Sequence, residues 1–158
     1  MYEVTVTTAR CKTLRALRET FKEKRCYIHD RAEDMLLRAV AQAPANGRTF
    51  RVAILTVSEL GFERRTAYLP IGTRALGRGL LLCPGIVGPC LRLRLCGQQG
   101  KENLSNRITV AMEPMPNFLG NPFVFELVRA FGHDLLYADW VCDHTEFNPH
   151  DSLAFLKT

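Results

Sequence analysis

The sequence lacks the long apolar runs that mark membrane-spanning or secreted chains. No window approaches the roughly 18 uninterrupted apolar residues of a membrane helix, and the strongest candidate, residues 123–128, is interrupted by Glu126. The first ten residues, MYEVTVTTAR, contain no apolar core of a secretory leader. We therefore expect no membrane insertion and a cytoplasmic or nuclear location.

Signature motifs of common enzymes are also missing. The chain contains no G-x-S-x-G, G-x-x-x-x-G-K-[ST], H-E-x-x-H or G-x-G-x-x-G pattern, so we assign no catalytic residue and no cofactor. A small hydrolase or metal-dependent enzyme remains an alternative, because histidines with neighbouring carboxylates suit acid–base chemistry. Its site would lie in residues 133–151, which hold His133, Asp134, Asp139, Asp143, His144, Glu146, His150 and Asp151.

The six cysteines lack the regular spacing of a disulfide framework. They are Cys11, Cys26, Cys83, Cys90, Cys96 and Cys142. A chain of 158 residues buries enough surface to fold without cross-links, so we expect reduced thiols and no bound zinc. A weaker alternative is a zinc site, in which Cys26 and His29 would combine with Cys142 and His144.

The remaining composition is that of an ordinary folded domain. Apolar residues make up 47% and charged residues 23% of the chain, and neither a repeat nor a linker divides it. We expect one globular domain spanning residues 1–158.

Local patterns predict an α+β fold. The segments predicted as strands are 2–7, 49–57, 68–71, 80–83, 90–96 and 107–113, with a polar loop at 97–106. The segments predicted as helices are 12–24, 30–43, 122–131 and 135–141, and a final turn is predicted at 151–156. The expected fold is a mainly antiparallel sheet of about five to six strands, with two N-terminal helices and one C-terminal helix packed on it.

Charge is distributed unevenly along the chain. Residues 1–110 carry a net charge of +10 and residues 111–158 carry −5, and 16 of the 21 basic residues are arginine. Arginine forks suit phosphates, so binding of nucleic acid through an arginine-rich face is the second hypothesis. The residues of that face would be Arg64, Arg65, Arg74, Arg78, Arg92 and Arg94.

Apolar residues in exposed-looking positions favour binding to another protein. Such residues occur in a segment bounded by proline and glycine and in the C-terminal tail, and they are Met115, Phe118, Leu119, Phe155 and Leu156. Several apolar segments of this kind are typical of a surface that awaits a partner. Our leading hypothesis is a non-catalytic interaction or assembly module that can self-associate, for example an accessory or structural protein of a virus.

Overall fold

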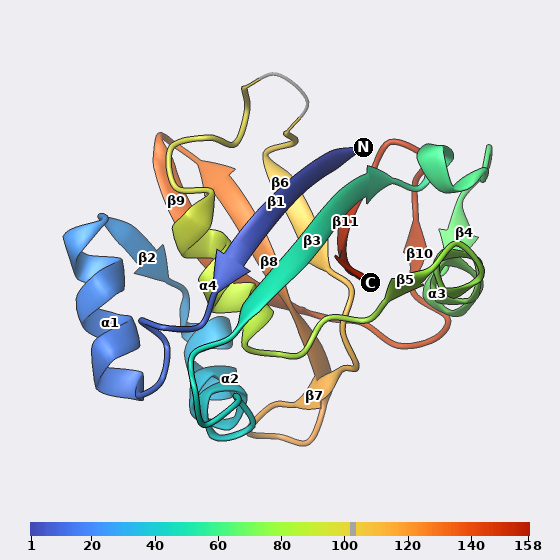
Figure 1. The fold of residues 1–158 in the computed structure, drawn as a ribbon. Helices are drawn as coiled ribbons and strands as arrows, with labels where there is room; N and C mark the ends of the chain where they lie inside the picture. Colours follow the sequence, from blue (N-terminus) through green and yellow to red (C-terminus); the bar gives the residue numbers. More distant parts are fainter. Residues whose placement is uncertain (102–103) are drawn as a thin grey trace.

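The computed structural model describes residues 1–101 and 104–158, and within these residues it contains one large sheet, a small sheet and four α-helices (Figure 1). The strands of the large sheet are β1 (Tyr2–Thr7), β2 (Cys26–Ile28), β3 (Thr49–Thr56), β5 (Leu80–Leu81), β6 (Arg107–Val110), β7 (Met115–Pro116), β8 (Pro122–Ala130), β9 (His133–Trp140) and β11 (Ser152–Lys157). The small sheet pairs β4 (Thr66–Ala67) with β10 (Glu146–Phe147). The helices are α1 (Leu14–Glu23), α2 (Asp30–Ala41), α3 (Tyr68–Gly77) and α4 (Val87–Arg94), with a 3-10 turn at Ser58–Leu60.

The large sheet mixes parallel and antiparallel pairs. Its order is β1-β3-β11-β6-β8-β9-β2, with β5 beside β11 and β7 beside β8. The pairs β11–β6 and β2–β9 are parallel, and the others are antiparallel. The expectation of a mainly antiparallel sheet of five to six strands with three helices is therefore wrong, because the described residues form a nine-stranded mixed sheet with four helices.

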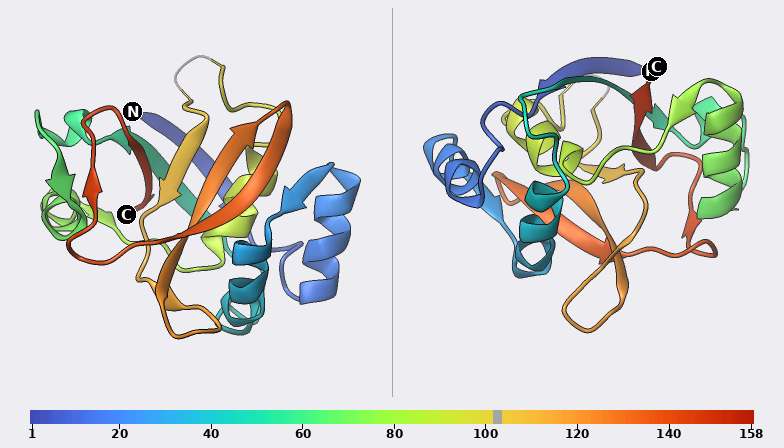
Figure 2. Two further views of the ribbon diagram at one scale, coloured as in Figure 1. Left: turned by 180° about the vertical axis from the view of Figure 1, so that it is seen from behind. Right: turned by 60° about the horizontal axis from the view of Figure 1, so that its bottom comes forward.

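Helix α4 lies inside the curl of this sheet. Figures 1 and 2 show β1 and β3 on one side of the helix and β8 and β9 on the other, and α4 contacts β1, β8 and β9. All residues from 87 to 93 are buried. At Gly88 an added Cβ would lie 2.6 Å from the ring of Phe125, so glycine permits the close approach of helix and strand. Apart from exposed Arg94 at its C-terminal end, this helix is covered by the sheet and forms the centre of the core.

The prediction of a strand at 90–96 is wrong for the same reason. Leucines alternating with Arg92 and Arg94 resemble a half-exposed strand, but α4 is buried except at Arg94, so its sequence shows no amphipathic helical pattern. Arg92 is completely buried and is held by Asp134 at 3.3 Å and by the carbonyl oxygen of Leu95 at 3.2 Å. Burial lowers the pKa of Arg92 to about 10, against the opposing effect of Asp134.

The predicted C-terminal helix, with its segments 122–131 and 135–141, is instead the hairpin β8–β9. Residues 122–128 contain apolar residues at almost every position, which satisfies helical spacing and strand alternation equally well. The hairpin turns at Phe131 and Gly132, with φ of 52° and 75°. Positive φ at two central residues suits a two-residue hairpin turn, so this chain segment reverses as a pair of strands.

The N-terminal predictions are confirmed, whereas two more of the later ones are wrong. Segments 2–7 and 49–57 are the strands β1 and β3, and the two predicted helices are α1 and α2. The predicted edge strand at 68–71 is the start of α3, where Pro70 falls in the first turn and no helical hydrogen bond is lost. The predicted final turn is the internal strand β11. Residues 102 and 103 of the predicted loop 97–106 lie outside the described residues.

Candidate protein-binding surface

The turn between β7 and β8 is held by its own hydrogen bonds. The side-chain oxygen of Asn117 accepts hydrogen bonds from the backbone N–H groups of Leu119 and Asn121, both at 2.9 Å. The backbone N–H of Gly120 donates to the carbonyl of Asn117 at 2.9 Å. Asn117 therefore fixes the turn that presents Phe118 and Leu119.

Two hydrogen bonds from helix α2 also anchor this turn. Asp34 accepts a hydrogen bond from the backbone N–H of Phe118, and Arg38 donates to the carbonyl of Pro116. Leu37 follows Asp34 by three positions, so it lies on the same side of α2. These two hydrogen bonds join the turn to the part of α2 that carries Leu37, although the two segments are about 80 residues apart in the sequence.

The side chains of Phe118, Leu119 and the neighbouring Leu37 are largely exposed to solvent. Phe118 is 86% exposed, Leu119 is 78% exposed and Leu37 is 64% exposed. We call Leu37, Phe118 and Leu119 the hairpin patch. Burying one such side chain against a partner would contribute about 1.5–3 kcal/mol. Because the backbone is already ordered, little conformational entropy is lost on docking.

The structure does not bring the other predicted binding residues to this surface. Met115 is buried in β7, and Phe155 is buried in β11 between β3 and β6. Leu156 is half-buried and packs against the core. The prediction that the C-terminal tail forms a docking surface is therefore corrected for Phe155, because the apolar run 153–155 fills an internal strand.

The large sheet also borders a polar cavity of about 230 Å³. This cavity lies where β6, β8 and β9 meet the loop before β11. Four titratable lining residues come from the predicted segment 133–151, namely Asp139, Glu146, His150 and Asp151. Its most buried carboxyl group is that of Glu126, which is only 4% exposed and accepts hydrogen bonds from Arg107 and Thr109, each at 3.2 Å.

Burial is the largest influence on the pKa of Glu126. Its pKa is raised above 4.5, because removal from water disfavours the carboxylate more than Arg107 favours it, and nearby Asp139 raises it further. A carboxyl group in such a cavity can donate a proton or a hydrogen bond. Sequence reasoning missed Glu126 because it placed this residue on a helix, away from the segment 133–151.

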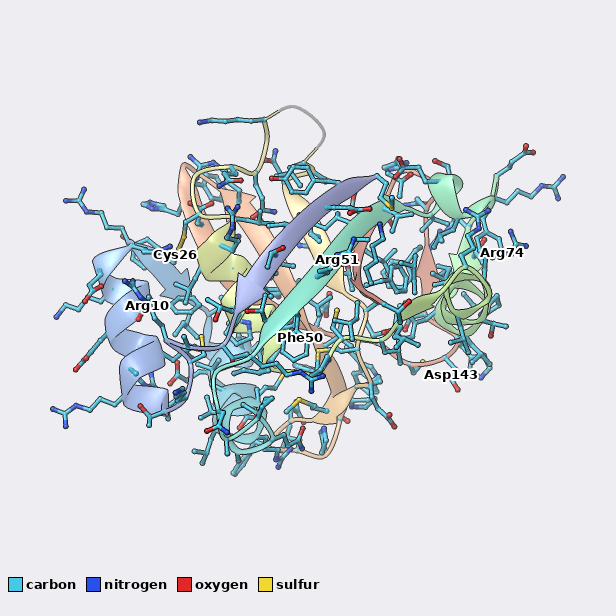
Figure 3. All side chains as sticks on the ribbon, in the orientation of Figure 1. Arg10, Cys26, Phe50, Arg51, Arg74 and Asp143 are labelled. Atoms are coloured by element: carbon cyan, nitrogen blue, oxygen red, sulfur yellow. A yellow bond between two sulfur atoms is a disulfide. The ribbon has the colours of Figure 1, made fainter. Side chains whose placement is uncertain are left out.

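The six arginines of the nucleic-acid hypothesis do not form one face. Arg64, Arg65, Arg74 and Arg78 are exposed around α3 and the loop before it, and Arg65 pairs with Glu146 at 3.4 Å. Arg94 is exposed on α4, beside Arg10 and Lys24, whereas Arg10 and Arg74 lie on opposite sides of the molecule in Figure 3. Arg92 is buried and cannot contact a nucleic acid. The hypothesis remains a prediction for the four residues around α3.

The residues of the zinc hypothesis also lie apart. Cys26 is joined to Cys96 in a disulfide, with 6.9 Å between the Cα atoms. His29 caps α2, where its Nδ1 accepts a hydrogen bond from the backbone N–H of Arg31 at 3.2 Å. Among the described residues, the one group of potential metal ligands is Cys26, Cys96 and Asp134, and it includes neither Cys142 nor His144.

Two further thiols face each other in the core. The sulfur atoms of Cys90 and Cys11 lie 2.9 Å apart, so α4 meets the segment before α1 at this point. Exposed Cys142 accepts a hydrogen bond from the hydroxyl of Thr145 at 3.6 Å, which lowers the pKa of its thiol. The expectation of six reduced thiols remains a prediction for the protein in its own compartment, although the structure joins Cys26 and Cys96.

No family model, curated protein or solved structure matches this chain. Across the described residues, every helix is too short or too polar to cross a bilayer. A function is therefore inferred from the hairpin patch and the polar cavity themselves.

Proposed function

We propose that this chain is a non-catalytic protein-interaction module that docks through the hairpin patch. The single observation that supports this function is the exposure of Phe118 and Leu119 on a turn whose backbone is fixed by Asn117 and by Asp34. Apolar side chains that serve only the core are not displayed on an anchored turn. A fixed apolar projection is what a complementary pocket on a partner recognises.

Photo-crosslinking tests this proposal directly. Phe118 is replaced by p-benzoylphenylalanine, and the purified chain is irradiated in a lysate of its source cells. Phe131 provides a matched control, because it is 99% exposed in the turn that follows β8, at the opposite end of this strand from Phe118. We expect a discrete adduct from position 118 that excess unlabelled wild-type chain suppresses. Equal labelling from both positions, or no adduct from position 118, would contradict the proposal.

The polar cavity supports a second candidate function, the binding or hydrolysis of a small polar molecule. The specific observation is a buried carboxyl group with a raised pKa that lies beside the carboxyl group of Asp139. In this function Glu126 donates a proton, and the hydroxyl and carboxyl groups of the wall bind hydroxyl or ammonium groups of the ligand.

The single tryptophan of the chain gives this second candidate its test. Trp140 lines the cavity, so ligand entry changes its fluorescence. Monosaccharides and primary amines at millimolar concentration are titrated as probes against wild type and Glu126→Gln. A saturable change that the variant loses supports the cavity as a binding site. Unchanged fluorescence with both classes of probe removes this candidate and leaves the hairpin patch unaffected.

A further inference from the structure

Two thiols that come from distant segments of the chain are in direct contact. The thiol of Cys90 donates a hydrogen bond to the sulfur of Cys11, with 2.9 Å between the two sulfur atoms. Cys11 is 1% exposed and Cys90 is 4% exposed. A disulfide bond is about 2 Å long, so the sulfur atoms need to approach by only roughly 0.9 Å to form one. The pair is therefore placed for covalent bonding while both cysteines are still thiols.

A groove of about 560 Å³ reaches both of these cysteines. It lies between β1, α1 and the last turn of α4, and Cys11 and Cys90 are among the residues that line it. A groove of this size admits solutes as small as water to the two sulfur atoms, although the thiols expose little surface. The charged residues that line it are Arg10, Lys24 and Arg94, and none of the lining residues is acidic. No carboxylate in the groove therefore opposes the formation of a thiolate there.

The hydrogen bond between the two thiols makes them chemically unequal. Because Cys90 donates it, the bond lowers the pKa of the Cys11 thiol and outweighs the opposing effect of burial. The same bond holds the proton of Cys90, and together with burial it raises the pKa of that thiol. The thiolate is the nucleophile in thiol oxidation. The geometry thus favours Cys11 as the first sulfur to react and Cys90 as the thiol that completes the bond.

The disulfide between Cys26 and Cys96 joins the same two parts of the chain. Cys26 begins β2, the strand that follows α1, and Cys96 lies two residues after the end of α4. Cys11 precedes α1, and Cys90 lies within α4. Figure 1 shows α1 at the edge of the molecule, and this helix contacts α4. A bond between Cys11 and Cys90 would therefore fix the start of the α1 segment to α4, as the existing disulfide fixes its end.

From the sulfur contact, the groove that reaches it and the neighbouring cross-link, we infer that Cys11 and Cys90 are an oxidation site, at which a peroxide converts the two thiols to a disulfide. Cys11 loses its proton to water and attacks one peroxide oxygen, the O–O bond breaks, and the leaving hydroxide takes up a proton to become water. The sulfur of Cys90 then attacks the sulfur of the Cys11 sulfenic acid, and the S–O bond breaks as the hydroxyl leaves with the proton of Cys90 as a second water. The two thiols are oxidised, and hydrogen peroxide is reduced to water.

The burial of the two sulfur atoms selects the class of oxidant. A peroxide is little larger than the water molecules that the groove admits. A disulfide such as oxidised glutathione must bring one of its own sulfur atoms into line with the attacking thiolate, and access limits that exchange. A thiolate on Cys11, which is 1% exposed, is therefore reached by a peroxide and shielded from a bulky disulfide.

Peptide mapping of the full chain tests the inference. The chain is reduced, freed of reductant and treated with hydrogen peroxide at micromolar concentration. The remaining thiols are alkylated in denaturant, and cleavage after arginine followed by mass spectrometry without reduction locates each cross-link. We expect a Cys11–Cys90 cross-link that dithiothreitol reverses.

Cys83 provides a matched control for burial within the same experiment. It is 4% exposed, like Cys90, but its thiol donates to the carbonyl oxygen of Ala154 at 3.5 Å. Burial also raises the pKa of Cys83 to about 12. Cys83 should therefore lose its free thiol at least about tenfold more slowly than Cys11.

Two variants and a second oxidant test the order of the steps and the class of oxidant. In Cys90→Ser the sulfenic acid on Cys11 has no thiol to react with, so dimedone should label position 11. In Cys11→Ser burial keeps Cys90 protonated, so dimedone should label position 90 at least about tenfold more slowly. With the wild-type chain, oxidised glutathione at the same concentration should form the Cys11–Cys90 cross-link at least about tenfold more slowly than hydrogen peroxide does.

Full alkylation of Cys11 and Cys90 at a time when exposed Cys142 has been oxidised would overturn the inference, and this measurement needs no variant. So would loss of the Cys83 thiol at the same rate, because contact between two sulfur atoms would then confer no reactivity. Equal labelling of the two variants, or equal rates with the two oxidants, would also contradict it. The oxidation site lies outside the hairpin patch and the polar cavity, so none of these results bears on crosslinking from Phe118.

Discussion

Two Phe-Leu pairs look alike in the sequence and have opposite roles in the structure. Phe118-Leu119 lies in a segment bounded by proline and glycine, and Phe155-Leu156 lies near the C-terminus. Phe118 is 86% exposed, whereas Phe155 is 1% exposed. Phe155 belongs to an apolar strand whose register places it opposite Ala53 of β3, while Phe118 sits in a turn that Asn117 holds. Backbone pairing with a distant strand, rather than hydrophobicity, decides which pair is buried.

The largest effect that tests this comparison is the loss of folding stability in Phe155→Ala. Removing a fully buried aromatic ring should cost about 3–5 kcal/mol, because the surrounding side chains cannot fill the cavity. The matched variant Phe118→Ala should change the free energy of unfolding by less than about 0.5 kcal/mol, since its ring contributes little to the core. Urea denaturation of both variants measures the difference. Similar losses from the two substitutions would contradict the assignment of one pair to the core and the other to the surface.

A pH series extends the comparison of buried and exposed positions to charge. Burial raises the pKa of Glu126 above 4.5, so the folded chain keeps this proton at a pH where the unfolded chain has lost it. The resulting stabilisation is complete below pH 4.5 and declines as pH rises through the raised value. In Glu126→Gln this decline should be absent. Free energies of unfolding between about pH 4 and pH 8 measure the change, and parallel curves for the two proteins would contradict it.

The smallest effect compares the two turns at the ends of β8. Phe131 occupies positive φ, which is unfavourable for an aromatic residue and tolerated by asparagine. Phe131→Asn should therefore stabilise the chain by about 0.5–1 kcal/mol. Phe118 does not have positive φ, so Phe118→Asn should give no such gain. Melting temperatures of the two variants, recorded under identical conditions, test whether the exposed phenylalanines differ in backbone strain. Equal shifts would contradict the difference.

Sequence patterns predicted β1, α1 and α2 because each of these elements has one covered face and one exposed face. Strand β1 alternates and α1 is amphipathic, so their periods are visible in the sequence. Strand β8 is largely buried, and its nearly continuous apolar sequence carries no period that separates helix from strand. Helix α4 is also largely buried, and its leucines alternate with Arg92 and Arg94, which is the period of a strand. The central position of β11 depends on pairing with β3 about 100 residues away, which no local pattern reports.

The candidate sites could likewise be predicted only where local sequence patterns define them. Phe118 and Leu119 were predicted from the prolines and glycine around them, which define a turn without reference to the rest of the chain. Leu37 was missed because only the packing of α2 against that turn makes it part of the patch. Glu126 was missed because its place in the cavity depends on its strand pairing with β6 and β9.

The central claim is that the hairpin patch binds a partner, and one binding measurement tests it most directly. The protein identified by crosslinking from position 118 is titrated against wild type, Phe118→Ala and Phe131→Ala. We predict that Phe118→Ala weakens the complex by about 2 kcal/mol or more, at least 30-fold in dissociation constant, with an unchanged melting temperature. Phe131→Ala should bind within about twofold of wild type. Equal affinity of wild type and Phe118→Ala would contradict the claim.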